Sequence, residues 1–299
     1  DDWPDPEVSA DDVLIKTIAG SIYPKDVLLR KGKFSRTFAR DPLPRVSGMD
    51  AAGEIVAVGS NVTNFSVGDT VFGMTNNFAG GVHAEIAKFH QTEIYHSPSN
   101  ISLEESSCVP LAAQTALQAL RDCCAIENGH KVLINGASGG VGHFAVQIAK
   151  ILGAEVHAVC GPRNVQYVES LGADFIYRYT DQPATEIDLS FDVIFDVFGK
   201  FTRSAFAEQL GIRSIFVSTV PKPATLWGEA LARLGVSKIS RLVQVRSRTD
   251  DLKCIKEWIE SGLVVPRLEK TYTVGQATEA HRHVESKHTI GKVCIVFTT

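Results

Sequence analysis

The sequence lacks the patterns that mark several classes of protein. It contains neither C-x-x-C nor H-E-x-x-H among its 6 cysteines and 9 histidines, so neither a zinc knuckle nor a metalloprotease site is indicated. No apolar run reaches the ~18 residues of a membrane span, and no signal-peptide pattern opens the chain. The net charge is only −4, which gives no reason to expect nucleic acid or an anionic membrane as a partner.

These absences leave an ordinary globular protein. Hydrophobic residues make up 44% and charged residues 21% of the chain, a composition typical of a well-packed core. The cysteines lie mostly in apolar stretches, as buried thiols of a reducing compartment do, so we expect the protein in the cytoplasm. A length of 299 residues favours about two domains.

A glycine-rich turn is the most informative stretch. The predicted strand Lys131–Asn135 runs into GASGGVG at residues 136–142, and apolar residues then recur at helical spacing up to residue 152. The fingerprint G-x-G-x-x-G is met with alanine at its first position. Such a turn lets backbone N–H groups approach a pyrophosphate at the positive end of a helix. A purely structural turn is the alternative.

The end of the next strand indicates which dinucleotide binds. The acidic residue that would hold the ribose 2′-hydroxyl of NAD, about 20 positions further on, is missing after strand Glu155–Cys160. Arg163 follows instead. A guanidinium pairs with phosphate through two parallel hydrogen bonds, so the sequence favours NADPH as the cofactor. A solvated arginine at the start of a helix is the alternative.

The pattern of elements changes twice along the chain. Residues 1–107 predict short strands at 13–19 and 51–58, and a turn followed by a strand within each of 67–73 and 80–86. This spacing favours a compact, partly closed β-barrel. After a helix at 111–120, strands and helices alternate, which predicts an α/β fold with a doubly wound parallel sheet. Its expected helices are 165–171, 201–210 and 252–261. The tail, 272–297, breaks this alternation, and we expect it to return to the first domain.

With these elements in order, the chain resembles the zinc-free quinone oxidoreductase branch of the medium-chain dehydrogenase/reductase superfamily. The matching motifs are YPKD at 23–26, RKG at 30–32, GMDAAG at 48–53, VG at 58–59, GD at 68–69, VPLA at 109–112, the glycine turn, LGAD at 171–174, FDV at 191–193 and GKV at 291–293. The resemblance implies a GroES-like β-barrel domain from residues 1–107 and 266–299, around a Rossmann NADP-binding domain at 108–265. Members usually carry one more β-hairpin before the equivalent of Pro6, so we expect either a truncation or a natural difference there.

The resemblance also bears on whether the protein holds a catalytic zinc ion. Zinc-dependent relatives place a cysteine where Ile22 or Tyr23 stands, and a histidine–glutamate pair where Met49 and Asp50 stand. Because catalytic zinc needs three protein ligands, we expect no metal. The acceptor must then already be electrophilic: a quinone or an α,β-unsaturated carbonyl.

Two residues are candidates for catalysis. Many quinone reductases of this branch have asparagine where Tyr23 stands, and a tyrosine there resembles the enoyl reductases of the superfamily. Tyr23 would protonate or polarise the acceptor, because a phenol of pKa near 10 can donate a proton to an enolate; a packed aromatic side chain is the alternative. Asp26 would orient this loop, or would be a solvated carboxylate at a helix start.

Cofactor contacts are implied along the second domain. They are Thr115 near the nicotinamide phosphate, Ser138, Gly139, Gly140 and Val141 at the pyrophosphate, Arg163, Asn164 and Tyr179 at the 2′-phosphate, and Phe198 and Ser218 at the nicotinamide. Tyr177 and Arg178 compete with Tyr179 for the phosphate.

Two other functions stay open. An enoyl-thioester reductase acting on an acyl carrier or coenzyme A would need a basic rim, for which Lys222, Arg233, Lys238 and Arg241 are candidates. A non-catalytic NADPH-binding protein is the other. The segments 78–81 and 221–241 face the cleft in family folds, but neither selects a substrate. Family members often pair through an edge strand, here 242–245, so we expect a homodimer.

Overall fold

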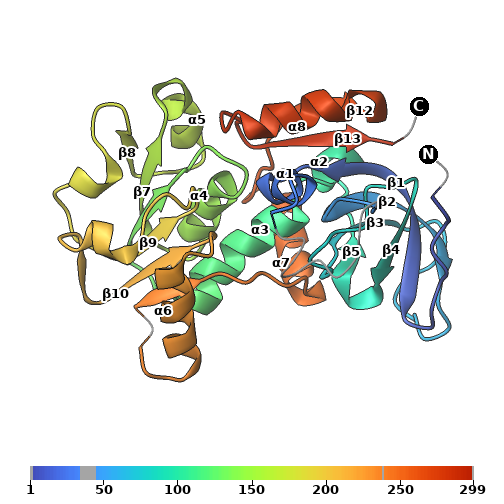
Figure 1. The fold of residues 1–299 in the computed structure, drawn as a ribbon, viewed down its shortest axis with the longest axis horizontal. Helices are drawn as coiled ribbons and strands as arrows, with labels where there is room; N and C mark the ends of the chain where they lie inside the picture. The colour runs from blue at the N-terminus through green and yellow to red at the C-terminus, as the bar shows by residue number, and fades with distance from the viewer. Residues whose placement is uncertain (1–2, 34–44, 238, 298–299) are drawn as a thin grey trace. The chain divides into compact units, whose positions relative to one another are not determined.

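The computed structural model describes residues 3–33, 45–237 and 239–297 (Figure 1). The chain divides into two units. The terminal unit contains both chain ends, Asp1–Gln114 and Arg246–Thr299, and the central unit is Thr115–Val245. Relative to the predicted domains, the first boundary lies seven residues later (114 against 107) and the second twenty residues earlier (245 against 265).

The terminal unit is built on a seven-stranded sheet in the order β12-β13-β1-β2-β3-β5, with β4 also paired to β1. Its strands are β1 (Asp12–Ser21), β2 (Asp50–Val58), β3 (Thr70–Met74), β4 (Ile86–His90), β5 (Ile94–His96), β12 (Leu268–Thr273) and β13 (Lys292–Val296). The return of the tail is confirmed, because β13 pairs antiparallel with β1. Alternate residues of β1, such as Val13 and Ile15, are fully buried in the core against Ile55 and Phe89.

One predicted strand of this unit is wrong. Residues 80–85 form no strand, and β4 begins only at Ile86. Gly80 and Gly81 have φ of 86° and 138°, in the left-handed region that favours glycine and interrupts extended backbone. The segment is therefore a loop that leads into β4.

The helices of the terminal unit are α1 (Pro24–Arg30), α2 (Leu103–Ser106), α7 (Thr249–Glu260) and α8 (Ala277–Glu285), and α3 (Pro110–Leu117) crosses the first boundary. A capping box begins α2, with hydrogen bonds in both directions between Ser102 and Glu105. The sequence assigns the helix expected at 252–261 to the alternating α/β part of the chain, but α7 packs against β5 of the terminal unit. Asn100 donates to the Ile259 carbonyl, and Ser99 to Glu260, which places α7 in this unit.

The central unit has six parallel strands in the order β11-β10-β9-β6-β7-β8, which confirms the doubly wound parallel sheet (Figure 1). The strands are β6 (Lys131–Asn135), β7 (Glu155–Cys160), β8 (Phe175–Arg178), β9 (Phe191–Asp196), β10 (Leu210–Ser218) and β11 (Ser240–Leu242), with helices α4 (Gly142–Ile151), α5 (Val165–Ser170) and α6 (Pro223–Arg233). The order reverses at β6, and at such a switch point open sheets bind ligands beyond the carboxyl ends of the strands.

Two details of the central unit differ from expectation. The predicted helix 201–210 is wrong: only Arg203–Phe206 form a short 3-10 turn, and Leu210 already starts β10 beside Phe191. Phe206 is fully buried in the core of the unit, so packing against the sheet overrides the helical propensity of this segment. The edge strand is Ser240–Leu242, which overlaps the expected 242–245 only at Leu242.

The remaining short helices are 3-10 turns, except for one π-helical turn that follows α3. The 3-10 turns lie at Gln91–Glu93, Pro162–Asn164, Ala184–Glu186 and Val274–Gln276, and the π-helical turn is Gln118–Cys123.

Candidate active site

The glycine turn of the central unit leaves a helix N-terminus open. A Cβ on Gly142 would lie 2.0 Å from the Gly136 carbonyl oxygen, so only glycine permits this close turn. No side chain caps α4, and among the described residues the N–H groups of Gly140 and Val141 donate to no acceptor. Uncapped N–H groups at a helix N-terminus bind anions. The turn therefore fits a pyrophosphate, although the N–H of Gly139 is already bonded to the Gly136 carbonyl.

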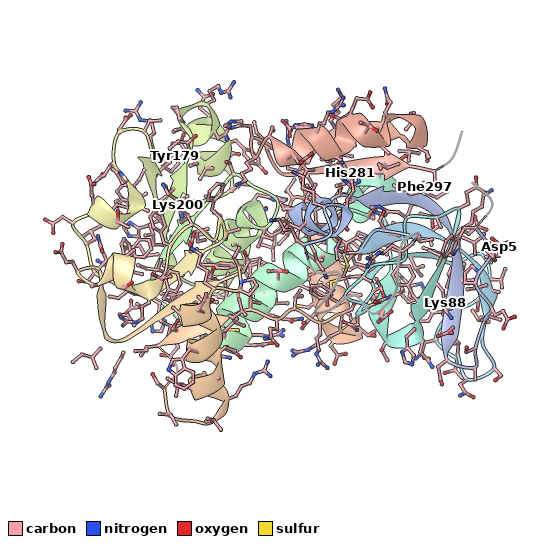
Figure 2. All side chains as sticks on the ribbon, viewed as in Figure 1. Asp5, Lys88, Tyr179, Lys200, His281 and Phe297 are labelled. Atoms are coloured by element: carbon pink, nitrogen blue, oxygen red, sulfur yellow. The ribbon has the colours of Figure 1, made fainter. Side chains whose placement is uncertain are left out.

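The residues predicted to hold the 2′-phosphate lie after β7 and β8. Asn164 donates to the Ser138 hydroxyl at 2.9 Å, which joins this group to the glycine turn. A Cβ on Gly161 would lie 3.3 Å from the Tyr179 hydroxyl, so Tyr179 reaches the end of β7, just before Arg163. Tyr179 is half exposed, and Figure 2 labels it on the central unit.

The two competing residues are engaged elsewhere. The Tyr177 hydroxyl is 3.0 Å from Nδ1 of the buried His157, and Arg178 forms an ion pair with Asp181. This leaves Tyr179 and Arg163 as the better placed side chains for a phosphate, and that assignment stays a prediction.

The carboxyl ends of β6, β9 and β10 meet around Asp196, a residue that the sequence did not single out. Its carboxylate accepts from Asn135 at 2.8 Å and from the Phe201 N–H at 2.7 Å, and burial raises its pKa. These bonds fix the loop that carries Phe198, which is 52% exposed. Ser218 is fully buried, with its hydroxyl donating to the Asp196 carbonyl.

Thr115, by contrast, is 4% exposed within α3. Apart from Ser218 and Thr115, the predicted cofactor residues thus present exposed or partly exposed side chains, or backbone groups.

In the terminal unit, the start of α1 carries the two predicted catalytic residues. Tyr23 is the N-cap, Pro24 opens the helix, and Asp26 accepts from the Tyr23 N–H at 2.8 Å. Asp26 is only 1% exposed, and burial raises its pKa. The alternative of a solvated carboxylate therefore does not hold. Asp26 bonds this turn from inside the unit, and its role in orienting the loop stays a prediction.

The Tyr23 side chain points into the unit, toward β2. Its hydroxyl donates to Oδ2 of Asp50 at 2.5 Å, and the Leu111 N–H donates to the same oxygen at 3.0 Å. Asp50 is fully buried, and burial raises its pKa to about 7. Burial and then the charge of Asp50 raise the pKa of Tyr23 well above its usual range. The geometry thus directs the phenol proton at a carboxylate and favours the packed alternative for Tyr23.

Two lysines that the sequence reasoning did not single out complete this cluster. Lys292 is 3% exposed; its Nζ donates to the Ile22 carbonyl at 2.8 Å and lies 3.0 Å from the centroid of the Tyr23 ring. Lys25 is half-buried; its Nζ lies 3.5 Å from the Met49 sulfur and 3.9 Å from the centroid of the Phe78 ring. Burial lowers the pKa of each to about 8. A lysine inside the apolar run KVCIV was the available signal for the first.

The donor set of this cluster does not suit zinc. The carboxylates of Asp26 and Asp50 both accept hydrogen bonds from Tyr23. The other groups at the start of α1 and β2 are a phenol, a thioether and ammonium groups, whereas catalytic zinc needs three ligands of the thiolate, imidazole or carboxylate kind. Over residues 3–33, 45–237 and 239–297, no group of three or more His, Cys, Asp or Glu side chains is arranged to hold a metal. The absence of a catalytic metal stays a prediction.

The basic rim expected for a thioester substrate is largely engaged. Arg233 and Arg241 both pair with Glu229, at 3.3 and 2.8 Å. Nζ of Lys222 donates to the carbonyls of Lys200 and Phe201. Lys238 lies outside the described residues. The rim therefore offers fewer unengaged cations than the sequence suggests.

Comparison with known proteins supports this arrangement. Residues 9–99 match the alcohol dehydrogenase GroES-like domain, and residues 171–295 match a family described as zinc-binding dehydrogenase. A chloroplast envelope quinone oxidoreductase homolog of Arabidopsis thaliana is 30% identical, covering 98% of this chain and 92% of that protein. An NADPH-dependent alkenal/one oxidoreductase of the same plant is 30% identical over 97% of this chain and 73% of its own.

Among solved structures, a quinone oxidoreductase from Coxiella burnetii has a TM-score of 0.89 and 26% identity, covering 99% of this chain and 93% of its own. None of the helices in the described ranges has the length and hydropathy to cross a bilayer. With the two folds, the glycine turn and these relatives in agreement, the chain belongs to the medium-chain dehydrogenase/reductase superfamily, in its quinone oxidoreductase-like branch.

Proposed function

We propose that this protein is an NADPH-dependent reductase of quinones or α,β-unsaturated carbonyls. Quinone reduction and alkenal/one reduction are the activities that the names of its relatives print. The observation that carries the proposal is the cluster at the start of α1. Its ionisable groups are Tyr23, Lys25, Asp26, Asp50 and Lys292, and it has no zinc donor set.

The central unit would bind the cofactor. The N–H groups of Gly140 and Val141 would hold the pyrophosphate, and Arg163 and Tyr179 the 2′-phosphate, which favours NADPH over NADH. When bound, NADPH supplies a hydride from C4 of its nicotinamide. Phe198, held by the Asp196 loop, would lie against the nicotinamide.

The terminal unit would bind the acceptor. Asp26 fixes the turn that begins α1, and Tyr23 is fixed through Asp50. Because Tyr23 is bonded to both Asp26 and Asp50, the residues around it are held in one geometry. Hydride transfer to one carbon of the acceptor requires such a fixed geometry. The exposed face of Phe78 would accept a flat apolar substrate.

Steady-state oxidation of NADPH tests the proposal. The protein should oxidise NADPH with 1,4-benzoquinone or with a simple enone, and should not oxidise primary alcohols with NADP⁺. Activity confined to an enoyl-coenzyme A would establish the enoyl-thioester reductase instead. Tight binding of NADPH without turnover of any acceptor would establish a non-catalytic binding protein.

Homodimer formation and a cytoplasmic location remain predictions. Some relatives are named as chloroplastic or mitochondrial proteins, so the compartment is best tested by fractionation.

A further inference from the structure

The ammonium group of Lys25 touches two residues of the terminal unit: Met49, where zinc-dependent relatives have a metal ligand, and Phe78, in a segment that faces the cleft in family folds. It donates to the Met49 sulfur at 3.5 Å and lies over the Phe78 ring, 3.9 Å from its centroid. In the described part of the chain it forms no ion pair with a carboxylate. A thioether is a weak acceptor and an aromatic face uses no hydrogen bond, so most of the three N–H donors are left for another partner.

The charges around Lys25 do not hold it in place. Asp26 on α1 and Asp50 on β2 act on it through space and raise its pKa, but burial lowers the pKa more, to about 8. Both carboxylates already accept hydrogen bonds, from the Tyr23 N–H and the Tyr23 hydroxyl. The other cation and the other proton donor of the cluster, Lys292 and Tyr23, are bonded to the Ile22 carbonyl and to Asp50.

Among these donors, Lys25 is the one that solvent or a substrate can reach. Tyr23 is 5% exposed and Lys292 is 3% exposed, whereas Lys25 is half-buried and its neighbour Phe78 is 38% exposed. Reduction of an enone places an electron pair on the carbonyl oxygen, and a nearby ammonium stabilises that charge most strongly where water is partly excluded.

We propose that Lys25 is the general acid of this reductase, donating a proton to the oxygen of the reduced acceptor. This inference rests on the proposed function and deepens it. The hydride of NADPH brings two electrons to the carbon β to the carbonyl, the C=C pair moves to form an enolate, and the N–H bond of Lys25 breaks as the O–H bond forms. The neutral amine then regains a proton from water, and the enol tautomerises in solution to the saturated carbonyl compound.

The inference predicts a difference between two acceptors. An enolate is more basic than the phenolate formed from a quinone, so enone reduction needs the proton more. Reduction of the enone should therefore depend on Lys25 more strongly than reduction of 1,4-benzoquinone, although both use the same hydride.

The test compares Lys25→Met, Lys25→Arg and Lys253→Met, the last being a control that removes an exposed lysine of α7. Lys25→Met should lower kcat for an enone by about 10²–10⁴-fold, the range for loss of a general acid, and benzoquinone turnover by less. Lys25→Arg keeps the charge but cannot donate near pH 8, so it should be intermediate and lose the alkaline limb of the pH profile. The control should match wild type.

Two further readouts separate this role from a structural one. The dissociation constant of NADPH and the urea midpoint of unfolding should be unchanged in all three variants. Because Lys292 also has a pKa near 8, the alkaline limb is assigned to Lys25 only if Lys25→Arg removes it.

If Lys25→Met keeps wild-type kcat for the enone and an unchanged alkaline limb, the general-acid assignment is wrong while the proposed function stands. If wild type turns over no quinone or enone, the proposed function fails, and the assignment fails with it.

Discussion

The two units differ in which groups interact with charge and in where those groups lie. In the central unit, the groups that suit a phosphate are backbone N–H groups at an uncapped helix and exposed side chains such as Arg163 and Tyr179. In the terminal unit, the charged groups are side chains inside the fold: Asp26, Asp50 and Lys292 are at most 3% exposed. Backbone groups bind an anion at no cost in buried charge, whereas buried side chains acquire shifted pKa values that suit proton chemistry.

The same contrast explains how much the sequence could predict. The glycine turn, its strand and its helix are local, so spacing alone predicted them. The residues assigned to the phosphates were implied by the resemblance, and that assignment stays a prediction. The cluster of the terminal unit joins residues far apart in the chain: Tyr23 and Asp50 are 27 positions apart, and Lys292 bonds the Ile22 carbonyl across 270. The motifs GMDAAG and GKV were quoted for the resemblance, but nothing in them says that Asp50 and Lys292 meet Tyr23.

The errors in secondary structure have the same origin. Residues 201–210 have helical propensity, but Phe206 is taken into the core and Leu210 into the sheet. α7 has the length and pattern of a helix of the alternating part of the chain, but its contacts are with β5 and residues 99–100. Tertiary contacts decided both cases.

The largest effect should come from removing the buried cation. Lys292→Met leaves Asp50 and Asp26 without the positive charge that lowers their pKa, and should lower the free energy of unfolding by about 3–5 kcal/mol. Lys270→Met is the matched control, because that exposed lysine lies 4.8 Å from the Tyr272 ring and should contribute at most about 1 kcal/mol. Urea unfolding measures both variants. If Lys292→Met and Lys270→Met lower the free energy of unfolding equally, burial of the charge is not what distinguishes the units.

The phosphate site should discriminate between cofactors. Arg163→Glu should weaken binding of NADPH by about 10–100-fold, the loss of about 1.5–3 kcal/mol for a charge-assisted bond, and should leave NADH nearly unchanged. Fluorescence titration measures both. Arg178→Glu is the control, since Arg178 pairs with Asp181; selective weakening of NADPH in this variant would transfer the phosphate role to Arg178.

The glycine turn should separate folding from binding. Gly142→Ala places a Cβ 2.0 Å from a carbonyl oxygen and should cost about 1–3 kcal/mol of stability. Gly139→Ala meets its nearest atom at 3.5 Å and should fold normally while still lowering NADPH affinity. Thermal unfolding and titration together measure this, and a Gly142→Ala variant as stable as wild type would contradict the close approach.

The buried carboxyl should make stability depend on pH. Burial raises the pKa of Asp50 to about 7, so its protonated form favours the folded state. That contribution is present below its ordinary value near 4 and is lost as the pH rises through about 7. The pKa of Lys292 is lowered from 10.5 to about 8, so its titration changes the stability only between these two pH values.

Wild type should therefore lose about 1 kcal/mol or more relative to Asp50→Asn between pH 5 and pH 8. Urea unfolding of both proteins at the two pH values measures the difference. If the two proteins change in parallel, Asp50 is ionised throughout, and the buried cluster does not shift its pKa.

The most direct test of the account follows one atom. With NADPH carrying deuterium at the transferred position of C4 and an enone as acceptor, the product should be a saturated ketone with the deuterium on the carbon β to the carbonyl. An allylic alcohol with deuterium on the carbonyl carbon, or a product without deuterium, would contradict direct reduction of an activated double bond by this protein.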